Sequence, residues 1–168
     1  FVLHFTTDVA TQGYPVPLAA VQPEGSMIYE SEAPGIFGEN DEDRFTLDLE
    51  AGQVLSVVLS AEDPSLLGGV EIFGPDGGSL GSAEAPAGGE KAVVRTAEIA
   101  QTGTYTLAVQ AIQGSGRYRL QALLNSDREE ETAGQSGWSD TLASAQNIDG
   151  SFIPLYSGAN RGAVRGQI

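Results

Sequence analysis

Period-two alternation is clearest in the stretch Asp43-Arg-Phe-Thr-Leu-Asp-Leu-Glu-Ala-Gly52-Gln-Val-Leu-Ser-Val-Val-Leu59, which decides the fold. Apolar residues occupy every second position on both sides of a turn signal at Ala51-Gly52. They are Phe45, Leu47 and Leu49 before the turn, and Leu55, Val57 and Leu59 after it. Because successive side chains of a strand point to opposite faces, this pattern predicts a β-hairpin with one face toward a core.

Further strand signals follow at short spacing along the chain. Val70-Glu-Ile-Phe73 runs into a segment with Pro75 and Asp76-Gly77, which favour a tight reversal. Residues 103–109 and 116–124 carry their apolar side chains on one phase, which places Tyr105 and Tyr118 in the core. No segment has the pattern of an amphipathic helix. The sequence therefore predicts an all-β fold, an antiparallel β-sandwich of about seven to eight strands with extra terminal strands.

Composition narrows the class of protein and of partner. The 168 residues suit about one domain, and 22 glycines with 8 prolines favour many turns. With 23 acidic against 8 basic residues, the net charge is −15, which disfavours nucleic acid and anionic membranes as partners. No stretch of about 20 apolar residues exists, so we expect no membrane insertion. The chain has no cysteine, which excludes disulfides and thiolate sites.

Two short echoes indicate an internal repeat. Residues 1–8 resemble residues 118–127, and residues 142–153 resemble residues 18–28. Such self-similarity is typical of a tandem array, of which this chain would contain one complete unit. The predicted parts are the last strand of a preceding unit plus linker (1–23), a complete sandwich (24–125), an acidic linker (126–139) and the first strand region of a following unit (140–168).

Four motifs taken in order point to a known family. They are the stretch from Asp43 to Leu59 quoted above, Val70-Glu-Ile-Phe-Gly-Pro-Asp-Gly77, Thr102-Gly-Thr-Tyr-Thr-Leu-Ala-Val109 and Gly116-Arg-Tyr-Arg-Leu120. Together they resemble the bacterial pre-peptidase C-terminal domain family. The resemblance covers residues 24–125, and residues 141–150 look like the opening segment of another such domain. It implies a jelly-roll-like sandwich attached to secreted peptidases and other exoproteins, and it includes related collagen-binding modules that use calcium.

The same resemblance directs attention to a candidate metal site. Calcium-using relatives place their ligands in an acidic segment before the first strands, and Glu39, Asp41 and Asp43 are the nearest candidates here. Calcium takes six to eight oxygen ligands, which these carboxylates could begin to supply. Two alternatives stay open. The segment could be a solvated loop leading into a strand, and Asp43 could bond local backbone amides.

An enzymatic role is not expected. Gly77-Gly-Ser-Leu-Gly81 matches the G-x-S-x-G nucleophile elbow, but that motif needs a strand-to-helix turn and no helix is predicted after Ser79. The only histidine, His4, falls on the polar phase of the first strand. We therefore expect neither catalytic residues nor a required cofactor, with calcium as the one candidate ion.

The sequence thus favours a non-catalytic, secreted or cell-surface accessory module of a larger multidomain bacterial protein. Its expected roles are spacing, solubility and adhesion to a surface or substrate, with neighbouring domains of the same polypeptide as partners. An alternative is a self-assembling subunit of an extracellular filament or surface layer. In that case copies would exchange strands, because residues 1–7 and 151–156 lack partners within the complete unit.

Overall fold

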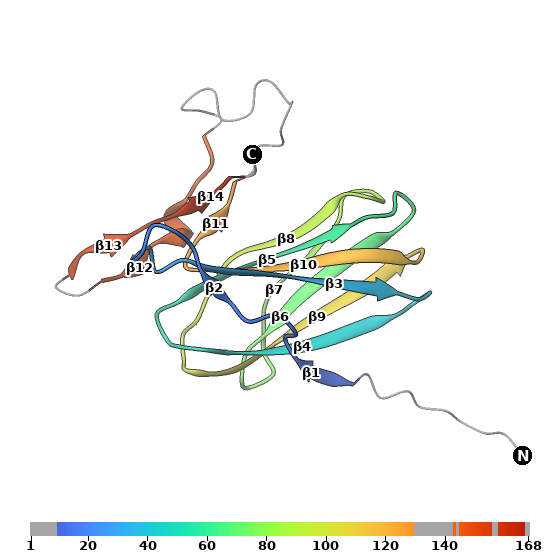
Figure 1. Cartoon of the computed structure of the whole chain (residues 1–168), viewed down its shortest axis with the longest axis horizontal. Helices are drawn as coiled ribbons and strands as arrows, with labels where there is room; N and C mark the ends of the chain where they lie inside the picture. The colour runs from blue at the N-terminus through green and yellow to red at the C-terminus, as the bar shows by residue number, and fades with distance from the viewer. Residues whose placement is uncertain (1–9, 130–142, 144, 156–157, 167–168) are drawn as a thin grey trace, which may run out of the picture.

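The computed structural model describes residues 10–129, 143, 145–155 and 158–166. In these residues the chain is almost entirely β-structure, arranged as two large sheets that face each other (Figure 1). The all-β sandwich predicted from the alternation is confirmed. No helix within the described part is long and apolar enough to cross a membrane.

Eight strands build the sandwich. They are β3 (Tyr29–Phe37), β4 (Glu42–Leu49), β5 (Val54–Ala61), β6 (Leu67–Phe73), β7 (Ser79–Glu84), β8 (Lys91–Glu98), β9 (Gly103–Gln113) and β10 (Gly116–Leu124). Two short strands, β1 (Thr11–Gly13) and β2 (Ala19–Ala20), each extend one sheet. The resulting orders are β1-β4-β9-β6-β7 and β2-β3-β10-β5-β8.

The strand pairing identifies the sandwich as a jelly roll. β6 pairs with β7, β5 with β8, β4 with β9 and β3 with β10, and all four pairs are antiparallel. The chain therefore forms a nested double ribbon in which each successive pair lies in the opposite sheet. Rolling such a ribbon places the pairs side by side in two sheets of four strands each, which agrees with the predicted jelly-roll-like sandwich of about seven to eight strands.

The core lies between the two sheets and is built mainly from the side chains that the alternation predicts to point inward. In the hairpin of residues 43–59, Phe45, Leu49 and Leu55 are buried in the core. Leu47 packs against this core and stays partly exposed. The two aromatic residues predicted to be internal, Tyr105 and Tyr118, are buried as well.

Each buried tyrosine has a hydrogen-bond acceptor. Tyr105 donates its hydroxyl hydrogen to the carbonyl of Gln101 at 2.7 Å, and Tyr118 donates to Asp43 Oδ2 at 2.6 Å. The ring of Tyr118 stacks on Phe37 with 4.1 Å between centroids. These bonds offset the cost of burying two phenol groups.

Residues before the eight-strand sandwich pack against it. β1 pairs with β4 in parallel, and β2 pairs with β3. The side chains of Tyr14 and Leu18 contact the core, and the Tyr14 hydroxyl donates to the carbonyl of Leu120. Residues 11–20 thus add strands to this sandwich, while the assignment of 1–23 to a preceding unit stays a prediction.

The described residues after the sandwich gather at one end of it (Figure 1). β11 (Asp127–Arg128) pairs with β14 (Val164–Arg165), and β12 (Ile153–Pro154) pairs with β13 (Asn160–Arg161). The short 3-10 helix η1 (Asp149–Ser151) packs against β8. Ile153 therefore has a strand partner that also lies after residue 125, outside the predicted complete unit, and residues 156–157 lie outside the described part.

One buried carboxylate ties this end to the sandwich. Asp127 accepts hydrogen bonds from Arg95 on β8 at 3.2 Å and from Gln146 at 2.8 Å, and its side chain is almost fully enclosed. A charge out of contact with water requires such partners. Asp127 is therefore one polar link between the sandwich and the segment that follows it, and the ion pair of Arg165 with Glu30 is another.

Candidate functional site

A shallow depression of about 390 Å³ lies on the outer face of the sheet β4-β9-β6-β7. Its lining comes from all four strands: Glu42, Arg44, Gly69, Val70, Glu71, Phe73, Ser82, Ala83, Glu84, Ala108 and Gln110. We call this surface the acidic face, because three glutamates and one arginine line it. Its polar side chains occupy the outward phase of strands whose other phase forms the core.

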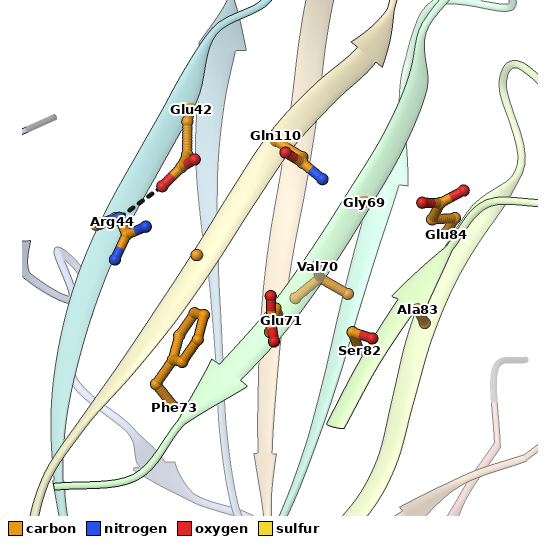
Figure 2. Close-up of a pocket in the computed structure, with 11 residues that line it drawn as sticks. Glu42, Arg44, Gly69, Val70, Glu71, Phe73, Ser82, Ala83, Glu84 and Gln110 are labelled. Atoms are coloured by element: carbon orange, nitrogen blue, oxygen red, sulfur yellow. Dashed lines mark hydrogen bonds and ion pairs between the residues drawn. The ribbon is translucent and has the colours of Figure 1, made fainter. Parts of the chain in front are cut away.

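Small residues in the middle of the sheet make the surface concave. Gly69 on β6 and Ala108 on β9 rise little above the backbone, while longer side chains stand around them. Figure 2 shows Glu42 and Arg44 on one side, Glu84 on the other, and Gln110 and Phe73 toward the two ends of the depression. An added Cβ at Gly69 would lie 3.0 Å from Ile112 Cδ1, so a larger residue here would require the Ile112 side chain to shift.

Electrostatic contacts hold one side of the depression in place. Arg44 Nε donates to Glu42 Oε1 at 2.5 Å, and the guanidinium lies 5.7 Å from the ring centroid of Phe73. Such a cation–π contact orients the arginine and leaves the ring partly exposed. Within the described residues, the side-chain carboxylates of Glu71 and Glu84 take part in no hydrogen bond or ion pair, so both can accept from a ligand.

This arrangement is suited to binding a polar ligand. Carboxylates accept hydrogen bonds from hydroxyl or ammonium groups, Gln110 can both donate and accept, and Phe73 offers an apolar surface. The three glutamates and one arginine leave an excess of two negative charges among the lining side chains. The face therefore favours neutral hydroxyl-bearing groups and cations over anions.

Two of the three predicted metal ligands, Asp41 and Asp43, accept hydrogen bonds from other groups of the protein, and the third, Glu39, is exposed. Asp41 accepts from the backbone amides of Gly38 at 2.9 Å and Glu42 at 3.0 Å, and Asp43 accepts from Tyr118. Glu39 is exposed in the loop between β3 and β4. In the described part of the chain, no three His, Cys, Asp or Glu side chains are grouped as a metal site would need. Calcium binding stays a prediction.

The alternative role predicted for Asp43, a hydrogen bond to local backbone amides, differs from what the structure shows. Its partner is the phenol of a residue on another strand, whereas the neighbouring Asp41 bonds the local backbone amides. Burial, followed by the hydrogen bond to Asp43, raises the pKa of Tyr118. The Tyr118–Asp43 pair is therefore an internal contact between the two sheets, because β10 and β4 belong to different sheets.

The serine of the G-x-S-x-G match lies in a hairpin. Gly74 and Gly78 close the β6–β7 turn with a 2.8 Å backbone hydrogen bond, and Ser79 begins β7. The motif thus continues as a strand, and no helix follows it in the described residues up to Glu129. His4 lies outside the described residues.

Sequence reasoning missed the acidic face, although a signal for it exists. Val70 and Ile72 define the inward phase of β6, so Phe73 is an aromatic residue on the outward phase. The adjacent Gly68-Gly69 pair removes side chains from the same strand. An outward aromatic beside glycines is a sign of a hollowed surface, but only the sheet order brings β4 and β7 to its two sides.

Comparison with known proteins identifies no family. No protein-family model matches the chain, and no curated protein matches its sequence. Among solved structures, it is similar to the periplasmic inhibitor of g-type lysozyme, PliG, from Aeromonas hydrophila, at 16% identity and a TM-score of 0.44, covering 62% of this chain and 92% of that one.

Two other solved structures show comparable likeness. The pre-peptidase C-terminal domain of a collagenase from Bacillus anthracis has 16% identity and a TM-score of 0.44, covering 55% of this chain and 88% of that one. A structure of infectious bursal disease virus, Gx strain, has 13% identity and a TM-score of 0.32, covering 67% and 37%. Identity at this level establishes no family, and the resemblance of the four motifs to the pre-peptidase C-terminal domain stays a hypothesis.

Proposed function

We propose that this protein is a non-catalytic binding module of an extracellular multidomain protein, and that its acidic face is the binding surface. The observation that carries the proposal is the depression lined by Glu71, Glu84, Gln110 and Phe73. These side chains stand on strands of one sheet, so their spacing is set before any ligand arrives. Such preorganisation reduces the entropy lost on binding.

The charge of the face selects the class of ligand. The lining carries more carboxylates than cations, and the whole chain has a net charge of −15. A neutral or cationic polymer rich in hydroxyl or amine groups therefore fits better than an acidic one. Because the depression is open and shallow, we expect it to hold one part of an extended surface, as an adhesion module does.

Binding to insoluble polymers tests the proposal. The protein is incubated with chitosan, cellulose and a carboxylated cellulose, and the bound fraction is measured after sedimentation. We expect retention on chitosan or cellulose, and weaker retention on the carboxylated form. Absence of retention on both of the first two, or preference for the carboxylated polymer, would overturn the proposal.

Substitutions of Glu71 and Glu84 test whether the acidic face is the surface that binds the polymer. Replacing Glu71→Gln together with Glu84→Gln removes two charges from the depression, and we expect binding to fall about tenfold, since each charge contact is worth up to about 1 kcal/mol. The control is Glu24→Gln, an exposed glutamate in the loop after β2. An equal loss from Glu24→Gln would move the site away from this face.

Strand exchange between copies has less support among the described residues. It needs terminal segments without partners, and β12 already pairs with β13 of the same chain. Residues 1–7, the other segment expected to exchange, lie outside the described part. Size-exclusion chromatography distinguishes the two functions, because a binding module stays monomeric as concentration rises and an exchanging subunit forms polymers.

A further inference from the structure

Strand β8 departs from regular pairing beside the segment that follows the sandwich. Its register with β5 shifts between Leu55 and Val57, where Ser56 of β5 lies opposite two residues of β8, Arg95 and Thr96. Such a β-bulge changes the direction in which side chains point, and bulges are common beside functional sites. Both residues of the bulge contact residues that come after the sandwich in the chain.

The backbone of Thr96 is strained. Its φ is 45°, in the left-handed region that a β-branched residue rarely adopts. Strain of this kind persists where surrounding contacts fix it, and it is found at sites that have a function. The amide of Thr96 donates to Ser56 Oγ at 3.0 Å, and Ser56 Oγ donates to the carbonyl of Ser126 at 3.0 Å. The bulge is therefore joined to the place where the chain leaves the sandwich.

Arg95 connects the bulge to an enclosed carboxylate. Its Nη1 atom contacts Asp127 Oδ1 at 3.2 Å and also donates to the carbonyl of Arg128. From the following segment, Gln146 Nε2 donates to Asp127 Oδ2 and to the same carbonyl, both at 2.8 Å. The Asp127 side chain is only 3% exposed, so its contacts are screened less than contacts on the open surface. Two shared acceptors thus join β8 to the segment.

Thr96 makes the second contact of the bulge with the segment. Gly150 of η1 lies against it, because an ideal Cβ on Gly150 would be 2.4 Å from Thr96 Oγ1 and 3.1 Å from Thr96 Cβ. The glycine therefore permits a close approach of η1 to the bulge. Ser151 and Ile153, just beyond this contact, are buried.

The remainder of the segment is held by β3 and β11. Arg165 contacts Glu30 of β3 at 3.1 Å. The amides of Asp127 and Glu129 donate to the carbonyls of Ala163 and Arg165, both at 2.9 Å. Contacts at separate points oppose rotation of the segment about any one of them.

We propose that the bulge of β8 is a docking site for residues 145–166, and that the docked segment is a rigid junction between this sandwich and the domain that follows it. A rigid junction fixes the orientation of the next domain, whereas a solvated linker would let it move. The contacts of the segment are with β3, β8 and β11, and the acidic face lies on the outer side of the other sheet, so the junction leaves that face open (Figure 1). The inference rests on the proposed multidomain arrangement, but not on the ligand of the acidic face.

NMR relaxation of the backbone amides in the whole chain tests the proposal. We expect order parameters of residues 145–155 and 158–166 to be close to those of the sandwich strands, about 0.85 for rigid backbone. Values below about 0.6 in these residues would identify a flexible linker and overturn the proposal.

A pair of substitutions tests whether the bulge is the docking site. In Gly150→Ala the added methyl group meets Thr96, and we expect lower order parameters in the segment and trypsin cleavage after Arg161 about tenfold faster, because a protease cuts the opened state. Adding Thr96→Gly removes the obstructing atoms and suits a φ of 45°, so the double variant should regain slow cleavage. Unchanged cleavage in Gly150→Ala, or no recovery in the double variant, would overturn the assignment.

Controls separate this junction from the rest of the molecule. Gly13→Ala adds a methyl group that meets nothing within 4 Å, so it should leave cleavage after Arg161 unchanged, and an equal acceleration there would contradict a local effect. The Glu71→Gln and Glu84→Gln variants of the acidic face should likewise leave the order parameters of the segment unchanged. Polymer binding and segment docking are thus measured independently, and failure of one proposal leaves the other standing.

Discussion

A methyl group added at Gly35 on β3 would collide with the ring of Tyr118 on β10. An ideal Cβ at this position would lie 2.5 Å from Tyr118 Cε1 and closer still to Cζ and the hydroxyl oxygen. The ring has nowhere to move, because it stacks on Phe37 at 4.1 Å and its hydroxyl donates to Asp43 at 2.6 Å. Gly35→Ala must therefore displace a buried aromatic residue that links the two sheets.

The expected cost follows from two contributions. Overpacking a core costs about 1–3 kcal/mol, and loss of a hydrogen bond to a charged group costs about 1.5–3 kcal/mol. We expect Gly35→Ala to lower the free energy of unfolding by about 3–5 kcal/mol, or the melting temperature by roughly 6–20 °C. Urea denaturation followed by circular dichroism measures the change.

A matched glycine serves as the control. Gly13 on β1 also lies in a strand, but an added Cβ there would meet nothing within 4 Å. Gly13→Ala is expected to change the stability by less than about 0.5 kcal/mol. The reasoning is refuted if Gly35→Ala costs no more than Gly13→Ala.

A double-mutant cycle tests whether the ring is the cause. In a Tyr118→Leu background the obstructing end of the ring is absent, so adding Gly35→Ala should cost far less than it does in the parent protein. Residues in contact show such non-additive effects, of about 0.5–3 kcal/mol. Additive costs would show that Gly35→Ala acts on the strand itself.

Three further predictions concern a buried phenol, a buried carboxylate and the acidic loop. Burial raises the pKa of Tyr14 from 10.0 to about 12, so between these values the folded state keeps a proton that the unfolded state loses. The free energy of unfolding should therefore fall as the pH rises from 10 toward 12, and it should fall less steeply in Tyr14→Phe. Identical pH profiles for the two proteins would contradict this. Asp127→Ala removes the ion-pair contact with Arg95 and should cost about 3 kcal/mol in urea denaturation, against almost nothing for the exposed Glu90→Ala; equal costs would exclude the link. A calcium site at Glu39, Asp41 and Asp43 predicts a higher melting temperature with calcium than with chelator, and coinciding melts would leave Asp41 with only its contacts to backbone amides.

The predictable part of the fold comes from local alternation. Phe45, Leu49, Leu55 and Tyr105 were assignable to the core because a strand turns each side chain by half a revolution, whatever the strand pairs with. The same argument placed Tyr118 inside. The jelly roll itself was predicted by the resemblance of the four motifs.

The candidate sites were much less predictable. The acidic face depends on β4, β9, β6 and β7 lying in that order, which brings Glu42 and Glu84 to one surface although they are far apart in the sequence. The role of Asp43 also changed, because its partner Tyr118 is 75 residues away. Nothing in the local sequence identifies such a partner, since the contact exists only after the two sheets have packed.

The sequence was enough to predict several of the strands and turns, the inward phase and the acidic character of this protein, because each depends on neighbouring residues or on composition, whereas β3 and β7 were not predicted. Tertiary structure alone decided which strands are adjacent and which outward side chains share a surface. Strand pairing is a choice among many distant segments, made by the combined packing of the core. The acidic face is a consequence of that choice, because its lining residues adjoin only in the folded sandwich.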